Sequence, residues 1–187
     1  MTALAFTEAV QTAAQYLREA RSVVALTGAG LSTPSGIPDF RSAGSGLWTQ
    51  NDPMKVSSLT TFRQRPERFF NWLRPLAQQI LAAEPNAAHA AMAELEQAGR
   101  LKAVITQNID GLHQRAGSLN VIELHGSLRQ AHCVHCHQAY SLELYAPAFI
   151  DREQIPRCPA CGWVLKPDII LFEEALTIKA LEEAQAR

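Results

Sequence analysis

Apolar positions along the chain fall into two patterns, one typical of strands and one typical of helices. Four short runs carry many β-branched residues and little charge: SVVALTG from Ser22, LKAVITQN from Leu101, NVIELHG from Asn120 and DIILFEE from Asp168. Runs of this kind are typical of strands that are covered on both faces. We therefore predict four buried strands at these positions.

The apolar period lengthens to that of a helix in other parts of the chain. Residues 7–20, after a cap at Thr7, place Val10, Ala13, Ala14 and Leu17 on one stripe, and residues 86–98 repeat the pattern before Gly99. Alternation of strands and helices predicts an α/β fold with a Rossmann-like, mainly parallel sheet and helices on both faces.

Two segments interrupt this alternation. Residues 49–82 form a helical insert in which aromatic and aliphatic side chains recur at helical spacing, as expected for helix packing. Residues 129–164 carry all the cysteines and little strand or helix signal. We predict a Rossmann-like domain from residues 1–128 and 165–187, and a small zinc-binding module at residues 129–164.

Composition narrows the choice of protein class. The 187 residues are 47% apolar and 19% charged with a net charge of −1, which fits a globular protein and gives no basic field for nucleic acid or an anionic membrane. The N-terminus has no pattern of a signal peptide, and no apolar run is long enough to span a bilayer. We expect a cytoplasmic protein with neither nucleic-acid nor membrane partners.

The stretch GAGLSTPSGIPDFR, residues 28–41, begins like a dinucleotide-binding turn and continues differently. Gly28 and Gly30 supply two glycines of the G-x-G-x-x-G pattern, but Thr33 occupies the third position and prolines follow. The backbone N–H groups of such a turn can face phosphates, although a glycine-rich turn without a ligand is the alternative. The loop ends in Asp39, Phe40 and Arg41, which have the character of ligand-binding residues.

Polar motifs also follow the second and third predicted strands. Gln107, Asn108 and Asp110 of TQNID suit hydroxyl and carboxamide ligands, although Asn108 or Asp110 could instead cap a helix. His125 of ELHGS could accept a proton near neutral pH, although a lone histidine is more often structural. The carboxyl ends of parallel strands meet at one edge of a sheet, where ligands bind, so we expect these loops to converge.

The cysteines form the strongest independent signal. Cys133 and Cys136 make one C-x-x-C pair, Cys158 and Cys161 make another, and the gap between the pairs holds 21 residues. Four thiolates complete a tetrahedral zinc shell and leave no open position, which predicts a structural Zn²⁺. Replacement of one thiolate by His132, His135 or His137 is the alternative, and His89 and His113, in helical surroundings, are expected to be structural.

The four motifs in this order closely resemble the sirtuins, NAD-dependent protein deacylases. KPDIILFEEAL, from Lys166, is similar to the family's substrate strand and loop, so the resemblance spans essentially the whole chain. It implies transfer of an acyl group from lysine to ADP-ribose with release of nicotinamide, through an O-alkylamidate. Its implied cofactors are NAD and Zn, and its implied partners are acylated, especially acetylated, lysine-containing proteins or peptides.

The resemblance also implies roles for individual residues. His125 is the implied general base, and Ile170 and Phe172 border the implied acyl-lysine tunnel and peptide-binding strand. Phe40 is implied to shield the reactive centre on a mobile loop. The residues implied to bind NAD are Gly28, Ala29, Gly30, Asp39, Phe40, Arg41, Gln107, Asn108, Ile109 and Asp110.

Two departures from the family pattern lead to further expectations. Phe172-Glu173-Glu174 replaces the common Phe-Gly-Glu, and the extra charge is expected to alter the loop beside the peptide, with basic peptides as one outcome. The chain stops at Arg187, before a strand and Gly-Thr-Ser turn that in the family help to bind adenosine and phosphates. Truncation is therefore expected, with weak NAD binding and low activity. The alternative functions are protein mono-ADP-ribosyl transfer and a non-catalytic fragment that binds zinc or NAD.

Overall fold

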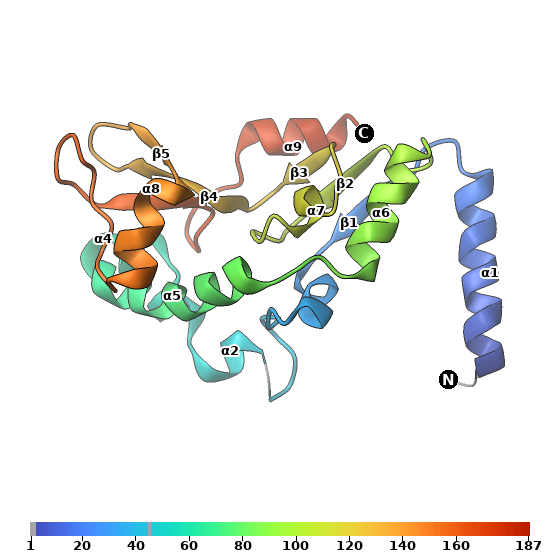
Figure 1. Cartoon of the computed structure of the whole chain (residues 1–187), viewed down its shortest axis with the longest axis horizontal. Coiled ribbons are helices and arrows are strands. Elements are labelled where there is room, and N and C mark those ends of the chain that lie inside the picture. The colour runs from blue at the N-terminus through green and yellow to red at the C-terminus, as the bar shows by residue number, and fades with distance from the viewer. Residues whose placement is uncertain (1–2, 45) are drawn as a thin grey trace.

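Two sheets form the framework of the chain in a computed structural model that describes residues 3–44 and 46–187. The first sheet has the order β1 (Val24–Thr27), β2 (Ala103–Thr106) and β3 (Val121–Glu123), and all its pairings are parallel. The second has the order β5 (Ala139–Ser141), β4 (Gly126–Cys133) and β6 (Leu165–Ile169), and its pairings are antiparallel. Because β3 leads into β4, the two sheets follow one another along the chain (Figure 1).

Helices connect and cover the strands. The α-helices are α1 (Ala3–Glu19), α2 (Leu47–Gln50), α3 (Pro53–Val56), α4 (Leu59–Gln64), α5 (Pro66–Ala82), α6 (Ala87–Gln97), α7 (Leu112–Arg115), α8 (Leu142–Ala146) and α9 (Ile178–Gln185). Short 3-10 helices η1 (Ala29–Leu31) and η2 (Thr33–Ser35) follow β1, and a π-helical turn η3 (Pro147–Asp151) follows α8. Helix α6 packs with α7, and α9 contacts β3.

The Rossmann-like α/β class is confirmed, and the first three predicted strands form the parallel sheet. The fourth prediction is wrong in its placement. Strand β6 begins earlier, at Leu165, and pairs with β4 in the second sheet. The apolar run from Asp168 indicates that a strand is buried, but it does not indicate which strand lies next to it. Within β6, Pro167 lacks an N–H group and so interrupts the row of donors. Strand β4 gave little signal because its burial does not alternate regularly.

The predicted helices at residues 7–20 and 86–98 correspond to α1 and α6. Asn86 caps α6, since its side chain accepts a hydrogen bond from the Ala88 N–H at 2.9 Å. Thr7 is not the cap of α1, because the helix already begins at Ala3. The apolar stripe of α1 is largely uncovered, with Val10 51% exposed, and the helix stands apart from the sheets in Figure 1.

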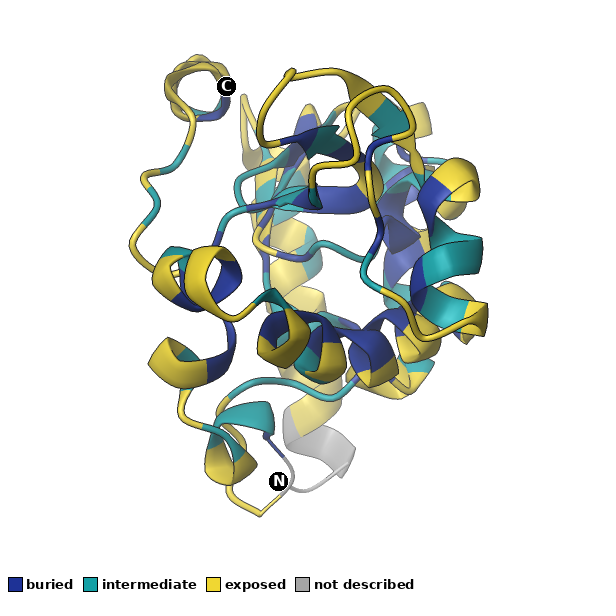
Figure 2. Cartoon of the chain, turned by 90° about the vertical axis from the view of Figure 1, so that its left-hand side faces the viewer, coloured by how far each residue is buried: buried dark blue, intermediate teal, exposed yellow. Residues whose placement is uncertain are grey.

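The largest apolar core joins the helical insert to the cysteine-bearing segment. Phe69 and Phe70 of α5 are fully buried, and the Phe70 ring meets that of Phe149, with centroids 5.4 Å apart. The buried Arg74 of α5 donates to the carbonyls of Phe149 at 2.8 Å and Glu153 at 2.9 Å. The buried residues, dark blue in Figure 2, gather where these helices and strands meet. The helix-packing prediction for the insert is thus confirmed for Phe69 and Phe70.

The domain boundaries proposed from the sequence stay a prediction. The pairing of β4 with β6 shows how the ends of the predicted zinc-binding module are connected. Residues 126–133 and 165–169 lie in one sheet, so both ends of the predicted module at residues 129–164 continue into a shared sheet. Within the residues that the structure describes, no helix has the length and apolar character needed to cross a membrane.

Gly126 marks the turn from β3 into β4, and its backbone has a φ of +70°. A Cβ atom there would lie 1.9 Å from the carbonyl oxygen of Asp168. We predict that Gly126→Ala abolishes folding or lowers the free energy of unfolding by more than the ~1–2 kcal/mol of left-handed backbone strain alone. Urea denaturation of the purified variant measures the loss.

Gly99→Ala is the matched control. Gly99 has a nearly equal φ of +68°, and its added Cβ atom would meet nothing within 4 Å in the part of the chain that the structure describes. The free energy of unfolding of Gly99→Ala should therefore fall only by the cost of the left-handed backbone strain. Equal stability losses in the two variants would contradict the close approach of Gly126 to Asp168.

Candidate functional site

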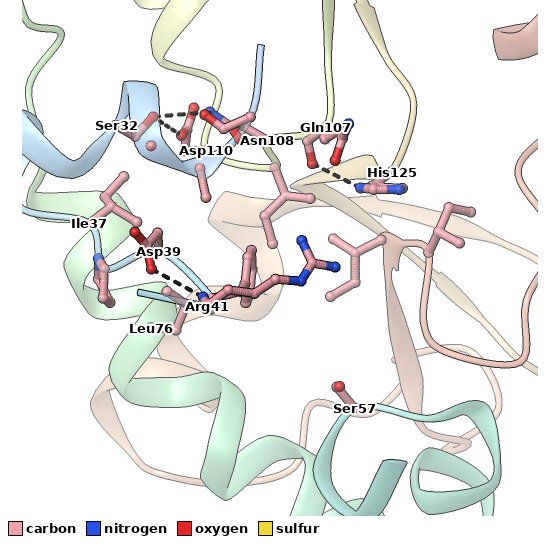
Figure 3. Close-up of a pocket in the computed structure, with 18 of the residues that line it drawn as sticks. Ser32, Ile37, Asp39, Arg41, Ser57, Leu76, Gln107, Asn108, Asp110 and His125 are labelled. Carbon is pink, nitrogen blue, oxygen red and sulfur yellow. Dashed lines mark hydrogen bonds between the residues drawn. The ribbon is translucent and has the colours of Figure 1, made fainter. Parts of the chain in front are cut away.

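A cavity of about 990 Å³ lies where the parallel strands end. Its walls come from the loops after β1 and β2, from His125 after β3, and from residues 169–174, which begin at the last residue of β6. The size is at the upper end for pockets that hold small molecules and cofactors. All the sequence-predicted site residues other than the cysteines line this one cavity, so the expected convergence of loops is confirmed as geometry (Figure 3).

The loop after β1 opens into the cavity without forming a long helix. Gly28 is extended, η1 and η2 follow, and Gly36 takes a left-handed φ of +88°. Among the described residues, a Cβ atom at Gly28 or Gly30 would meet no atom within 4 Å, so both glycines face open space there. Asp39 accepts hydrogen bonds from the N–H groups of Arg41 and Ser42, and the Ser42 hydrogen bonds hold the pKa of Asp39 below its ordinary value.

The loop after β2 is tied to the loop after β1 by side-chain hydrogen bonds. The buried Asn108 amide donates to the Gly28 carbonyl and to Ser32 Oγ, both at 3.1 Å. Ser32 Oγ in turn donates to Asp110 at 2.7 Å, and the other Asp110 oxygen accepts from the Leu112 N–H. These bonds, drawn in part in Figure 3, fix Asn108 and Asp110 relative to the glycine turn.

His125 has a defined ring orientation. Its Nδ1 lies 3.0 Å from the Gln107 carbonyl oxygen. A carbonyl can only accept, so Nδ1 carries the proton of the neutral ring and Nε2 keeps a free lone pair. The side chain of Arg41 extends into the cavity toward the same side (Figure 3). A half-buried imidazole held in this way can act as a proton acceptor.

An aromatic stack forms part of the wall, and the sequence interpretation missed it. Trp48 stacks on Phe40 with centroids 5.1 Å apart and on Trp72 at 5.6 Å, and it meets Phe172 edge-on at 5.9 Å. Helical spacing assigned the aromatics of the insert to packing alone. The position of Trp48, seven residues after the end of the polar loop at Arg41, was the available signal.

Residues 170–174 form the wall opposite the glycine turn. The Ile170 N–H donates to the His125 carbonyl at 2.9 Å, and Phe172 pairs through its backbone with Ser57 and Leu59. Glu173 has a left-handed φ of +74°, unusual for a residue other than glycine, and its carboxylate accepts from the Thr60 N–H at 2.8 Å. That hydrogen bond lowers the pKa of Glu173.

The four cysteine sulfurs lie within 4.8 Å of one another, away from the cavity. Cys133 Sγ is 3.4 Å from Cys161 Sγ, and Cys136 Sγ is 3.6 Å from Cys158 Sγ. A disulfide needs ~2.05 Å, whereas sulfurs around a tetrahedral zinc lie about 3.8 Å apart. The donor set therefore fits Zn²⁺, as predicted, without a histidine.

Two buried histidines lie behind the floor of the cavity. His89 of α6 is 0% and His113 of α7 is 1% exposed, and their ring centroids are 4.8 Å apart. Burial, and then the neighbouring His89, lower the pKa of His113 to about 4, while Asp110 acts in the opposite direction. Burial likewise lowers the pKa of His89. Both rings are therefore neutral near pH 7.

Comparison with known proteins adds to this geometry. Residues 28–187 match the Sir2 family. The chain belongs to the Sir2 family. It is 45% identical to NAD-dependent protein deacylase 2 of Archaeoglobus fulgidus over 94% of this chain and 68% of that relative. It is 43% identical to NAD-dependent protein deacetylase 2 of Caldanaerobacter subterraneus over 88% of this chain and 66% of that relative.

Solved Sir2 structures agree with this assignment. A structure described as showing the mechanism and regulation of Sir2 enzymes matches with a TM-score of 0.86 and 45% identity, over 94% of this chain and 69% of that one. A Sir2 protein with a p53 peptide and NAD⁺ matches with a TM-score of 0.83 and 43% identity, over 94% and 69%. The chain thus spans about two thirds of the length of these relatives. By family it is an NAD-dependent protein deacylase, as the resemblance implied.

Zinc should stabilise the cysteine-bearing segment of this Sir2-family chain. We predict that Cys158→Ala removes the bound metal and unfolds residues 129–164, because structural zinc supplies an apparent ~10–16 kcal/mol in small modules. Metal analysis and limited proteolysis of the purified variant measure both effects. Gln154→Ala, at an exposed position of the same segment, keeps all four thiols and should keep the metal. A folded, zinc-free protein with a Cys133–Cys136 disulfide would exclude the site.

The buried His113 should make stability depend on pH. The unfolded chain takes up a proton at this histidine below its ordinary pKa of 6.5, whereas the folded chain resists protonation until about 4. Stability should therefore fall as the pH drops from 6.5 towards 4. Denaturant titrations across that range should show a shallower dependence for His113→Gln, which cannot titrate. An unchanged pH dependence in this variant would exclude the contribution of His113.

Proposed function

We propose that this chain binds NAD and an acyl-lysine peptide side by side in the 990 Å³ cavity, with His125 as the general base of a protein lysine deacetylase. The observation that carries the proposal is the orientation of His125. Its Nδ1–H is held by the Gln107 carbonyl, which leaves the Nε2 lone pair available at the cavity wall. A fixed tautomer of this kind suits proton abstraction near neutral pH.

The proposed NAD site lies between the loops after β1 and β2. Open backbone at Gly28, Ala29 and Gly30 would approach the pyrophosphate, because no atom of the described residues fills the space in front of the two glycines. Gln107 and Asn108 would orient the ribose, and Ile109 and Asp110 would hold the carboxamide. Asp39, Phe40 and Arg41 would lie over the nicotinamide ribose. When bound, NAD supplies a cleavable nicotinamide–ribose bond and a ribose hydroxyl that accepts the acyl group.

The role of His125 follows from its position between the two proposed ligands. Its Nε2 would take the proton of a ribose hydroxyl and so make that oxygen a better nucleophile toward the acyl carbon. The Gln107 carbonyl would stabilise the positive charge that the ring then carries, since it keeps its hydrogen bond to Nδ1–H. Phe40, backed by Trp48, would shield the reacting centre from water.

The proposed acyl-lysine site lies beside Ile170 and Phe172. The peptide would add as a strand along residues 170–174, a mode that uses main-chain hydrogen bonds more than side chains. The apolar walls near Phe172 and Trp48 would receive the acyl-lysine side chain. The related Sir2 protein that holds a p53 peptide with NAD⁺ supports a peptide partner of this class. A cytoplasmic location stays a prediction.

The function is tested with His125→Ala and an acetyl-lysine peptide. We predict that the variant loses roughly 10²–10⁴-fold in turnover, because general-base catalysis contributes about that much. Its zinc content and thermal unfolding should match those of the parent, because the ring is half-buried and makes one hydrogen bond to the described residues.

Mass spectrometry of the small-molecule products separates the reaction classes. The parent chain should form nicotinamide and O-acetyl-ADP-ribose. Free acetate produced without NAD would contradict the proposal and indicate a simple hydrolase. ADP-ribose attached to protein, with the acetyl group retained, would replace it with mono-ADP-ribosyl transfer.

A further inference from the structure

Four buried polar side chains form a group at the back of the proposed NAD site, where Thr27 lines the cavity and the other three do not. They are His89 of α6, His113 of α7, Thr27 at the end of β1 and Thr106 at the end of β2, and each is at most 7% exposed. The rings of His89 and His113 meet at an interplanar angle of 62°. The roles proposed above for the cavity leave both histidines unexplained.

The tautomer of His89 follows from its backbone partner. The Asn86 N–H donates to His89 Nδ1 at 3.3 Å, as part of the cap of α6. A backbone N–H can only donate, so Nδ1 is unprotonated and the neutral ring carries its proton on Nε2. That Nε2–H is buried and has no acceptor among the described residues.

His113 presents the complementary atom. Its Nδ1 is also buried and lacks a partner within the described part of the chain, while its Nε2 lies 3.0 Å from Thr27 Oγ1. Thr27 Oγ1 donates to Thr106 Oγ1 at 2.8 Å, so it has no second proton to give and accepts from His113 Nε2–H. His113 Nδ1 is therefore an acceptor, and the centroid of its ring is 4.8 Å from that of the His89 ring, which carries the unused donor. A small ring rotation or one bridging water would satisfy both atoms.

We propose that these groups form a directed hydrogen-bond relay, from Asn86 through His89, His113 and Thr27 to Thr106, and that His113 is a positioning residue for the loop of residues 107–110. The relay ends at Thr106 Oγ1, which also accepts the Asn108 N–H at 3.1 Å. The inference rests on the proposed NAD site.

The relay reaches both loops of the proposed NAD site. Asn108, held at its N–H by Thr106, connects through its amide to Gly28 and Ser32, and Ser32 connects to Asp110. A substitution at His113 would remove the hydrogen bond that orients the Thr27 hydroxyl, and through Thr27 it would change the orientation of the Thr106 hydroxyl. Because Thr106 Oγ1 accepts the Asn108 N–H, the position of Asn108 would change as well. The effect passes through side chains that touch neither peptide nor zinc in the proposed arrangement, so it should fall on NAD binding.

The first test compares His113→Gln with His113→Asn. The amide nitrogen of glutamine can reach the place of Nε2 and donate to Thr27, whereas that of asparagine corresponds to Nδ1 and cannot. We expect the KM for NAD to rise about tenfold in the asparagine variant, the factor for one lost hydrogen bond. The KM for peptide and the zinc content should not change, and the glutamine variant should stay near the parent. Equal KM values for NAD in two folded variants would overturn the relay.

A second pair keeps the test decisive if a histidine variant fails to fold. Thr27→Ser retains the hydroxyl, whereas Thr27→Val has a similar shape and lacks it. Ser118→Ala is the matched control, because it removes a buried hydroxyl without a partner among the described residues, outside the relay. The valine variant alone should bind NAD more weakly by calorimetry. A serine variant as weak as the valine variant, or an equal loss in Ser118→Ala, would overturn the relay.

A spectroscopic measurement separates failure of the relay from failure of the proposed function. Long-range ¹⁵N–¹H NMR of the histidine rings in the parent chain should show the Nε2–H tautomer for both His89 and His113, without any NAD present. The Nδ1–H tautomer at His113 overturns the relay and leaves the proposed function intact. If the parent protein binds no NAD, both the proposed NAD site and the positioning role of His113 are excluded, even if both histidines have the expected tautomers.

Discussion

The parallel register of β1, β2 and β3 is the constraint on which the site depends. It places Thr27 opposite Thr106, and Thr106 opposite Glu123, so the three strands end at the same level. The glycine turn, the Gln107–Asp110 loop and His125 all begin within two residues of that level. A shift of register in one strand would move its loop by a residue and turn inward-facing side chains to the opposite face.

Sequence reasoning identified the site loops because their polar residues follow immediately after buried strands. It also identified the cysteine cluster, because ligand spacing is a local property of the chain. It misplaced the fourth strand, because an apolar run carries no information about its partner, and β4 has an irregular burial pattern. The Trp48 stack escaped for a similar reason, since it joins residues from three separate segments.

Tertiary contacts also explain how distant segments share one core. Arg74 reaches from α5 to two carbonyls around η3, and Lys166 of β6 forms a buried ion pair with Glu174 at 3.0 Å. Lys166 also donates to the Ile169 carbonyl at 2.8 Å. These cations satisfy buried backbone oxygens that would otherwise lose their hydration. The cysteine-bearing segment is therefore connected, through β6, to the segment that lines the cavity.

His125 contacts two walls of the cavity with different parts of the same residue. Its ring holds the Gln107 carbonyl, and its own carbonyl holds the Ile170 N–H. The proposed cofactor wall and the proposed peptide wall are thus joined through one residue, and the rotamer of His125 contributes to the spacing between them. A substitution that changes this rotamer would therefore act on both walls at once.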